Sequence, residues 1–398
     1  MNILFYCSEY PPFTTGGIGS VTKIVAELLV ERGHKVFVVG YYPDVQNLPE
    51  YSVVNGVRVF RLHKRFRDNG LVTRAIRVLS KLGCSKPIVQ SELTYTELFI
   101  EQLIKEQGID IVELTDYYSF NWQAKSLKYR RFPVPTVLRI HGCCSFILEG
   151  KGFDNTAAKI NDQHHFNRCD YISAVSQYSL DYIYQNFSTN HFKKKIVIYN
   201  PIEDSFLSAS SEEDKNVILF VGKLTETKGC YSLLKAFNLL AGKYPDLEVR
   251  LAGNGDKATA LSFVAPEYQE RVKFLGFCSR QQVQQEIDRC GFACIPSYFE
   301  NFSMVALEIL GRGKALIYTE RTSGKEIIQD GENGLLVNPE DIGQIKDKIE
   351  MLITDNSVRH RLADNGFNTV KTKFVASRIV SELEKFYSEI IIKNDCQC

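Results

Sequence analysis

Two glutamates eight positions apart mark the stretch of this chain best suited to chemistry. Glu300 and Glu308 lie in the segment 295–311, IPSYFENFSMVALEILG, which is typical of a strand end, a polar loop and an apolar helix. A helix start offers free backbone N–H groups and the positive end of the helix dipole, which favour a phosphate or diphosphate. The residues expected at that start are Phe302, Ser303 and Met304.

The spacing of the two acids suggests different targets for them. Glu300 precedes the helix and can point at a group attached to a bound phosphate. Glu308 lies at most ~8 Å along the helix axis from Ser303, at a rise of about 1.5 Å per residue, within reach of a neighbouring ribose. The hypothesis is a nucleotide-sugar site. The alternative is a buried strand–helix junction that carries two solvated glutamates.

The sequence of the first half of the chain predicts alternating strands and helices. Apolar runs at 2–7 and 34–40 flank a Gly-rich loop and an amphipathic helix, which predicts a βαβ unit. Gly17 belongs to that loop, where glycine lets the backbone approach a ligand closely. The loop matches the dinucleotide-binding motif poorly, because its sequence is GGIG and not GxGxxG and because it lies about eight residues beyond the strand.

Two further strands of this half end in polar residues. The strand expected over 134–142 ends in His141 and glycine, at the position where open α/β sheets bind ligands. The strand over 109–114 is followed by Asp116, Tyr117 and Tyr118.

The same alternation restarts after a polar, Ser-rich stretch. A strand over 216–222 leads into the loop GKLTETKG, which contains Lys223 and Lys228. Later strands end at Gly253 and near Phe277. The prediction is an α/β protein with two Rossmann-like, doubly wound domains that face each other across a cleft. The expected parts are an N-terminal Rossmann-like domain, a linker, a second Rossmann-like domain and a C-terminal helix that packs back toward the first domain, over residues 1–203, 204–215, 216–375 and 376–398.

The amino-acid composition is typical of a globular protein. The 398 residues are 44% hydrophobic and 24% charged, as expected for a globular protein of about two domains. Residues 1–200 carry 24 Lys and Arg against 18 Asp and Glu, so the first half is the one expected to face an anionic partner. The eleven cysteines are scattered without a zinc-ligand pattern, which favours reduced thiols. Neither a signal peptide nor an apolar run of membrane-spanning length is apparent.

A basic tract at 57–82 is a separate feature of the first half. It holds eight Lys and Arg against one acid, and apolar residues recur at helical spacing from Leu71 to Leu82. This pattern is typical of a basic amphipathic helix that rests on an anionic membrane surface. It also fits a helix packed on its own domain with a solvated basic face.

With these motifs in place, the sequence resembles the retaining glycosyltransferases of family 4, which have the GT-B fold. The resemblance covers nearly the whole chain. SYFENFSMVALEIL resembles the family's Glu-x7-Glu signature and VGKLTETKG its diphosphate-binding segment. Four further segments match in the family's order: SEYPPFTTGGIGS, IHG, FLGF and SGKEIIQDGENGLLV.

The resemblance implies roles for the residues singled out above. Glu300, His141 and Lys228 would be catalytic, with Glu300 and His141 on the transferred sugar. Glu308 would accept hydrogen bonds from the ribose hydroxyls. The donor site as a whole would consist of Gly17, Lys223, Lys228, Gly253, Phe277, Phe302, Ser303, Met304 and Glu308. GT-B enzymes bind the donor mainly through the second domain and the acceptor through the first, so the resemblance makes 216–375 the nucleotide-sugar-binding domain and 1–203 the acceptor-side domain. Asp116, Tyr117 and Tyr118 would then stack on or hydrogen-bond to the acceptor sugar. Lysines and helix N–H groups would stabilise the leaving diphosphate, so that neither a metal nor another cofactor is expected.

Two departures from the family pattern bear on the choice of donor. The usual Glu-Gly-Phe-Gly is Glu300, Asn301, Phe302 and Ser303 here, so both glycines are replaced. Lys223 occupies the position where the family usually has arginine. The planar guanidinium, which can bind phosphate through two hydrogen bonds, is thereby replaced by a compact ammonium group. Nothing in the sequence distinguishes a UDP-sugar from a GDP-sugar.

Other enzyme classes fit the sequence less well. The chain has no Asp-x-Asp tripeptide for a metal-dependent GT-A enzyme, no Gly-Lys-Ser/Thr P-loop, and no GxGxxG directly after the first strand. A GT-B sugar-nucleotide epimerase and a catalytically silent nucleotide-binding subunit remain as alternatives. The expected acceptor is a saccharide or polyprenyl-diphosphate-linked saccharide in surface polysaccharide or glycoconjugate assembly. The protein would be cytoplasmic or peripheral on an anionic membrane, with no nucleic-acid partner.

Overall fold

The chain forms two compact α/β units. The computed structural model describes residues 1–12, 16–42, 48–63, 86–118, 120–121, 124–208 and 213–395. Unit 1 comprises Met1–Pro201 together with Ala376–Cys398, and unit 2 comprises Ile202–Val375. The chain therefore builds the whole of unit 2 before its last helix returns to unit 1.

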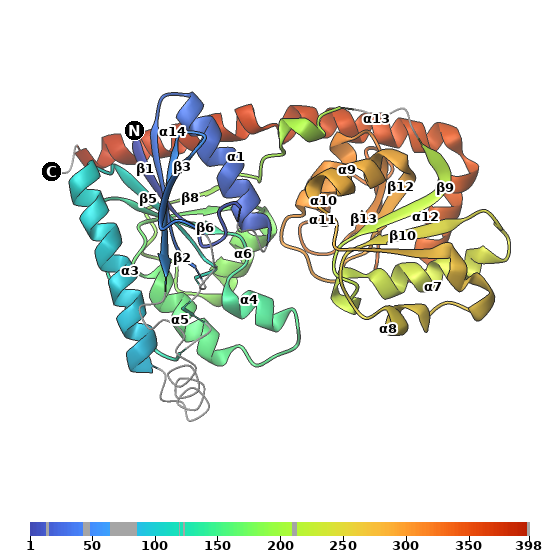
Figure 1. The fold of residues 1–398 in the computed structure, drawn as a ribbon, viewed down its shortest axis with the longest axis horizontal. Helices are drawn as coiled ribbons and strands as arrows, with labels where there is room; N and C mark the ends of the chain where they lie inside the picture. The colour runs from blue at the N-terminus through green and yellow to red at the C-terminus, as the bar shows by residue number, and fades with distance from the viewer. Residues whose placement is uncertain are drawn as a thin grey trace. The chain divides into compact units, whose positions relative to one another are not determined.

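Unit 1 is built on an eight-stranded sheet with the order β3-β4-β2-β1-β5-β6-β7-β8 (Figure 1). Its pairs are parallel except for β3 and β4, which are antiparallel at one edge. The central strands are buried on both faces, which explains their continuous apolar runs. The strands are β1 (Asn2–Tyr6), β2 (Lys35–Tyr42), β3 (Tyr51–Val54), β4 (Val57–His63), β5 (Ile111–Thr115), β6 (Thr136–Ile140), β7 (Tyr171–Ala174) and β8 (Lys194–Val197).

Helices complete unit 1. In the first of them, α1, apolar side chains three and four positions apart form one buried face, and Gly33 follows the helix with a positive φ of 87°. The helices are α1 (Gly17–Glu31), α3 (Lys86–Gln107), α4 (Cys144–Glu149), α5 (Thr156–Phe166), α6 (Gln177–Asn186) and α14 (Ala376–Asp395).

The C-terminal helix α14 is an integral part of unit 1. It contacts α1, beside which it is drawn in red in Figure 1. The Tyr387 hydroxyl donates a hydrogen bond of 2.5 Å to the buried carboxylate of Glu113 on β5. At the helix surface, Glu384 pairs with Arg32 of the segment that follows α1.

Unit 2 has a six-stranded, fully parallel sheet with the order β11-β10-β9-β12-β13-β14. From β9 the chain moves outward to β10 and β11, and then returns to the other side of β9 as β12. The strands are β9 (Asp214–Val221), β10 (Glu248–Ala252), β11 (Val272–Gly276), β12 (Cys290–Ile295), β13 (Ala315–Thr319) and β14 (Leu335–Val337).

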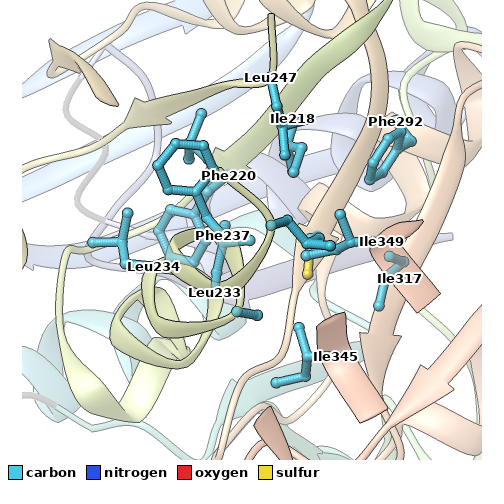
Figure 2. Close-up of a cluster of buried hydrophobic side chains, with 14 of the residues drawn as sticks. Ile218, Phe220, Leu233, Leu234, Phe237, Leu247, Phe292, Ile317, Ile345 and Ile349 are labelled. Carbon is cyan, nitrogen blue, oxygen red and sulfur yellow. The ribbon is translucent and has the colours of Figure 1, made fainter. Parts of the chain in front are cut away.

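The core of unit 2 lies between the sheet and its helices. Ile218 and Phe220 of β9 belong to one buried cluster with Leu233 and Phe237 of α7 and with Ile349 of α12 (Figure 2). Burial of each such side chain contributes about 1.5–3 kcal/mol. The helices are α7 (Cys230–Ala241), α8 (Lys257–Leu261), α9 (Arg280–Arg289), α10 (Met304–Gly311), α11 (Gly324–Ile327), α12 (Ile342–Thr354) and α13 (Asn356–Lys373), with 3-10 turns η1 (Asp204–Phe206), η2 (Glu226–Lys228) and η3 (Pro266–Arg271).

The predicted fold class, two Rossmann-like α/β halves, is confirmed. The basic tract at 57–82 begins with a strand, because Val57–His63 is β4. The helix predicted within the rest of that tract lies outside the described residues, as do residues 13–15 of the Gly-rich loop.

Candidate active site

The sheet of unit 2 has a topological switch point beside β9. Because β9 lies between β10 and β12, the loops that follow β9 and β12 leave the same edge of the sheet in different directions. Ligands of open α/β sheets bind in the crevice that such a reversal creates. The predicted lysines follow β9 and the predicted glutamates follow β12, so both sets flank this crevice.

Glycines bring the backbones of these loops into direct contact. Gly253, with a φ of +154°, follows β10, and a Cβ placed there would lie 1.9 Å from the carbonyl oxygen of Gly222. Gly229, with a φ of +75°, ends the turn that carries Lys228, and a Cβ there would lie 1.9 Å from the carbonyl oxygen of Pro296. A side chain at either glycine would therefore push the loops apart.

Lys228 and Glu300 form an ion pair across the two loops. The Lys228 ammonium lies 2.7 Å from Glu300 Oε2, and the two side chains are 34% and 18% exposed. Backbone hydrogen bonds hold the loops in register, because the Tyr298 N–H donates to the Thr227 carbonyl oxygen at 2.9 Å. A cation and a carboxylate are thus fixed side by side at the start of α10.

Ser303 is the N-cap of α10. Its hydroxyl accepts a hydrogen bond of 3.2 Å from the Ala306 N–H, and Met304 is the first residue of the helix. Phe302 is buried and meets Phe374 edge-on, with ring centroids 5.7 Å apart. The helix start is therefore a rigid feature, and its remaining N–H groups can receive a phosphate.

Glu308 lies one turn further along α10 and is almost fully enclosed. Its Oε1 accepts a hydrogen bond of 3.0 Å from Nη2 of Arg280, the first residue of α9. Burial raises the pKa of Glu308 to about 7; the Arg280 cation opposes that shift and the Glu203 carboxylate adds to it. A carboxyl with this pKa changes its charge in the neutral range.

Two other predicted donor residues are exposed at the same edge of unit 2. Phe277 follows β11, and 80% of its surface is accessible, which leaves an aromatic face available for stacking on a base. Lys223 follows β9 and is exposed. Unit 2 thus carries all of its predicted donor residues on the loops and helices that follow its strands: Lys223, Lys228, Gly253, Phe277, Glu300, Phe302, Ser303, Met304 and Glu308.

Sequence reasoning missed two residues of this site. Arg280 follows Ser279, whose capping box with Gln282 is a readable helix start, but nothing in the sequence shows that Arg280 meets Glu308. Asn301 was read only as a replaced glycine. Both polar atoms of its side-chain amide are buried without a hydrogen-bond partner among the described residues.

In unit 1, His141 follows β6 and is positioned by Asp116. The two carboxylate oxygens of Asp116 accept hydrogen bonds of 2.8 Å from the N–H groups of His141 and Gly142. Burial, assisted by the nearby Arg139 cation, lowers the pKa of His141 well below its usual range. The imidazole is therefore neutral at physiological pH, and it can donate one hydrogen bond and accept another.

The three candidate acceptor residues occupy different environments. Asp116 is fully buried, and this burial raises its pKa to about 7. Tyr118 is also fully buried. Its ring is tilted against that of Tyr6 and stacked on that of His165, at centroid distances of 4.4 and 4.7 Å. Tyr117 is half-buried, so it is the one of the three with an accessible side chain.

The Gly-rich loop of unit 1 leads into the start of α1. Gly17 is the first helical residue and Gly16 is its N-cap. A Cβ at Gly19 would lie 2.0 Å from the carbonyl oxygen of Glu9, so the helix start is pressed against the segment that follows β1. Among the described residues, no cluster of three or more His, Cys, Asp or Glu could hold a metal ion.

Two family models match consecutive parts of the chain. The model described as Glycosyltransferase Family 4 matches residues 15–206, and the model described as Glycosyl transferases group 1 matches residues 202–369. The chain belongs to glycosyltransferase family 4. The resemblance inferred from the sequence motifs is thereby confirmed.

Known proteins similar to this glycosyltransferase include both named and uncharacterised enzymes. An uncharacterized glycosyltransferase of Methanocaldococcus jannaschii is 27% identical over 97% of this chain and 98% of its own. The N-acetylgalactosamine-N,N'-diacetylbacillosaminyl-diphospho-undecaprenol 4-alpha-N-acetylgalactosaminyltransferase of Campylobacter jejuni is 28% identical over 70% of this chain and 78% of its own.

Solved structures establish the fold. Anabaena HepE in complex with UDP-glucose matches with a TM-score of 0.70 at 18% identity, over 98% of this chain and 100% of that one. Such neighbours have the GT-B fold, as the sequence predicted. Within the part of the glycosyltransferase that the structure describes, no helix combines the length and hydropathy needed to span a bilayer.

Proposed function

We propose that this glycosyltransferase moves a hexosyl or N-acetylhexosaminyl group from a nucleoside-diphosphate sugar to a saccharide or lipid-linked saccharide, with retention of anomeric configuration. The observation that carries the proposal is the Lys228–Glu300 pair, 2.7 Å apart, at the start of α10 in unit 2. A cation for a diphosphate and a carboxylate for sugar hydroxyls are there placed side by side, as a sugar attached to a diphosphate requires.

The reaction depends more on stabilisation of the leaving nucleoside diphosphate than on a protein side chain that acts as a general base. As the bond between the anomeric carbon and the phosphate oxygen breaks, the acceptor oxygen bonds to the same face of that carbon. The acceptor proton passes to the departing phosphate oxygen. Lys223, Lys228 and the N–H groups at the start of α10 stabilise the growing negative charge. On this account no metal is needed.

The remaining residues would orient the donor. Glu308 accepts hydrogen bonds from the ribose, and Phe277 and Gly253 lie on the side of the base and diphosphate. The family resemblance assigns His141 of unit 1 to the transferred sugar and Gly17 to donor binding, and we propose these roles for them. A UDP-sugar is the first candidate donor, because the structurally similar Anabaena protein binds UDP-glucose.

The acceptor is proposed from the relatives and from charge. The name of the Campylobacter relative places its acceptor on diphospho-undecaprenol, which supports a polyprenyl-diphosphate-linked saccharide and a role in surface polysaccharide or glycoconjugate biosynthesis. Such an acceptor would place the protein in the cytoplasm, in peripheral contact with an anionic membrane. Salt-sensitive co-sedimentation with anionic liposomes tests this contact, and its absence would contradict it.

A thermal-shift panel of UDP-, GDP- and ADP-sugars tests the donor site. At least one nucleotide sugar should raise the Tm of the wild-type protein, because a ligand that binds only the folded state stabilises it. Glu308→Ala and Lys228→Ala should reduce that shift. If no nucleotide sugar stabilises the wild type, or if both variants respond as the wild type does, the assignment fails.

A further inference from the structure

One guanidinium in unit 2 is shared by two carboxylates. Nη2 of Arg280 lies 3.0 Å from Oε1 of Glu308 and 3.2 Å from Oε2 of Glu203. Glu308 is the carboxylate assigned above to the ribose, and Glu203 lies two residues after Pro201, where unit 1 ends. Arg280 therefore links the donor site to the first residues of unit 2.

The position of Arg280 is well defined by its own helix. The Ser279 hydroxyl and the Gln282 side chain form a capping box that fixes the start of α9. The guanidinium carbon of Arg280 lies 5.3 Å from the ring centroid of Phe206. In the next turn of the helix, Gln284 Nε2 donates to the carbonyl oxygen of Ser205 at 3.0 Å. Helix α9 is thus fastened to the segment 203–206.

Arg280 and Glu203 shift the ionisation of Glu308 in opposite directions. The Arg280 cation favours the ionised carboxylate of Glu308, whereas the nearby Glu203 carboxylate disfavours it. Among the described residues, these two are the charged groups that face Glu308, one from α9 and one from the segment before η1. An ionised carboxylate can accept hydrogen bonds from both ribose hydroxyls, but a protonated one presents an O–H in place of one acceptor.

We propose that Arg280 is a positioning residue that holds the Glu308 carboxylate in place for the ribose of the donor, and that Glu203 competes for the same guanidinium. The inference rests on the proposed function, since it assumes that Glu308 binds the donor. It adds a residue that governs donor affinity without touching the reacting atoms. It also predicts that donor affinity depends on pH in the neutral range.

The test is to measure nucleotide-sugar affinity by calorimetric titration between pH 5.5 and 8.5. UDP-glucose, GDP-mannose and ADP-glucose are each titrated into the full-length protein, and the tightest of them is used for the variants. Glu308 binds a proton more tightly than an exposed carboxyl does, so its ionised form accumulates as the pH rises through 7. Wild-type affinity should therefore weaken about tenfold from pH 8 to pH 6.

Two variants should move the midpoint of this pH dependence in opposite directions. Arg280→Ala removes the cation beside Glu308 and should shift the midpoint upward by about one pH unit. Glu203→Gln removes the competing charge and should shift it downward. Arg280→Lys should restore part of the wild-type behaviour. In turnover, Arg280→Ala should raise the KM for the donor with little change in kcat.

A second arginine of the same kind serves as the control. Arg250 also lies between two carboxylates, 2.7 Å from Glu248 and 3.2 Å from Glu286 of α9, and has no place in the donor site. Arg250→Ala should leave the midpoint unchanged. If no nucleotide sugar binds the wild type, the proposed function itself fails. If one binds, and the Arg280 and Glu203 variants leave the midpoint in place or shift it in the same direction, the positioning role is wrong.

Discussion

At the scale of single residues, the proposed donor site depends on charges that face one another. Lys228 and Glu300 are paired at 2.7 Å on two loops of unit 2. A diphosphate sugar offers each of them a new partner, because the lysine can turn to phosphate and the glutamate to sugar hydroxyls. The ion pair is therefore better explained as a pre-organised site than as a source of stability, since partly exposed ion pairs contribute only about 0–1 kcal/mol.

Loss of the Lys228 charge should affect turnover more than folding. Lys228→Ala removes a cation from the leaving diphosphate and should lower kcat by about 100-fold or more, as loss of a single oxyanion-stabilising donor does. Lys243 provides a matched control, because it forms an equally short pair with Glu350 at 2.6 Å elsewhere in unit 2. Steady-state kinetics on Lys243→Ala should give wild-type values. Equal losses in both variants would show that Lys228 has no special role.

Asn301 should contribute to donor recognition at some cost in stability. Its buried amide has no hydrogen-bond partner among the described residues, although a buried unpaired polar group costs about 1–3 kcal/mol. Asn301→Ala should therefore leave the Tm unchanged or raise it, while the KM for the donor increases about tenfold. A lower Tm with an unchanged KM would instead assign Asn301 a structural role.

At the scale of elements, the start of α10 connects packing with chemistry. Ser303 caps the helix and thereby orients the N–H groups available to phosphate. The family's usual glycine at this position would leave the helix without a side-chain cap. Serine in place of glycine at position 303 is therefore compatible with a rigid helix start. An alanine there would remove the cap and weaken the start of the helix.

Two substitutions of Ser303 should show how much its hydroxyl cap contributes to stability, apart from the size of the side chain. Ser303→Ala should reduce the free energy of unfolding by about 1 kcal/mol, whereas Ser303→Gly should cost only about a few tenths of that, because glycine is tolerated at N-caps. Urea unfolding of the two variants and the wild type measures both differences. Equal stability of the alanine variant and the wild type would mean that the cap is unimportant.

Elements were easier to predict from the sequence than the contacts between them. The apolar runs before Lys223, His141 and Glu300 indicated buried parallel strands, so the polar residues after them could be placed at one edge of each sheet. Side-chain direction could not be read in this way. The loop after β5 turns Asp116 inward to hold the backbone of His141, whereas a strand-end position suggests exposure. Arg280 was missed because its contact depends on how α9 packs against 203–206.

At the scale of the whole molecule, unit 1 needs both ends of the chain. Helix α14 follows unit 2 in the sequence, yet its Tyr387 lies in the core of unit 1 and donates to Glu113 at 2.5 Å. Burial raises the pKa of Glu113, and the Arg139 cation opposes that shift. Unit 1 is therefore completed only after unit 2 has been synthesised.

Removal of a single hydroxyl should reveal this dependence. Tyr387→Phe deletes the hydrogen bond to Glu113 without creating a large cavity, and should lower the free energy of unfolding by about 1.5–3 kcal/mol, the range for hydrogen bonds to charged groups. Chemical denaturation measures the change. Tyr244→Phe removes a similar bond to Glu350 at the edge of unit 2 and should cost less. If both substitutions lowered the free energy of unfolding by the same small amount, α14 would be only loosely attached to the rest of unit 1.

Glu300 and its neighbours are proposed to transfer a sugar from a nucleoside diphosphate to an acceptor. The most direct measurement is the release of nucleoside diphosphate from the nucleotide sugar that binds, with and without a polyprenyl-diphosphate-linked saccharide, in wild type and Glu300→Gln. Release should be stimulated by the acceptor, should persist in EDTA and should fall about 100-fold or more in the variant, and the sugar product should keep the anomeric configuration of the donor. Release that requires a metal, inverts the configuration or is unaffected by Glu300→Gln would contradict it.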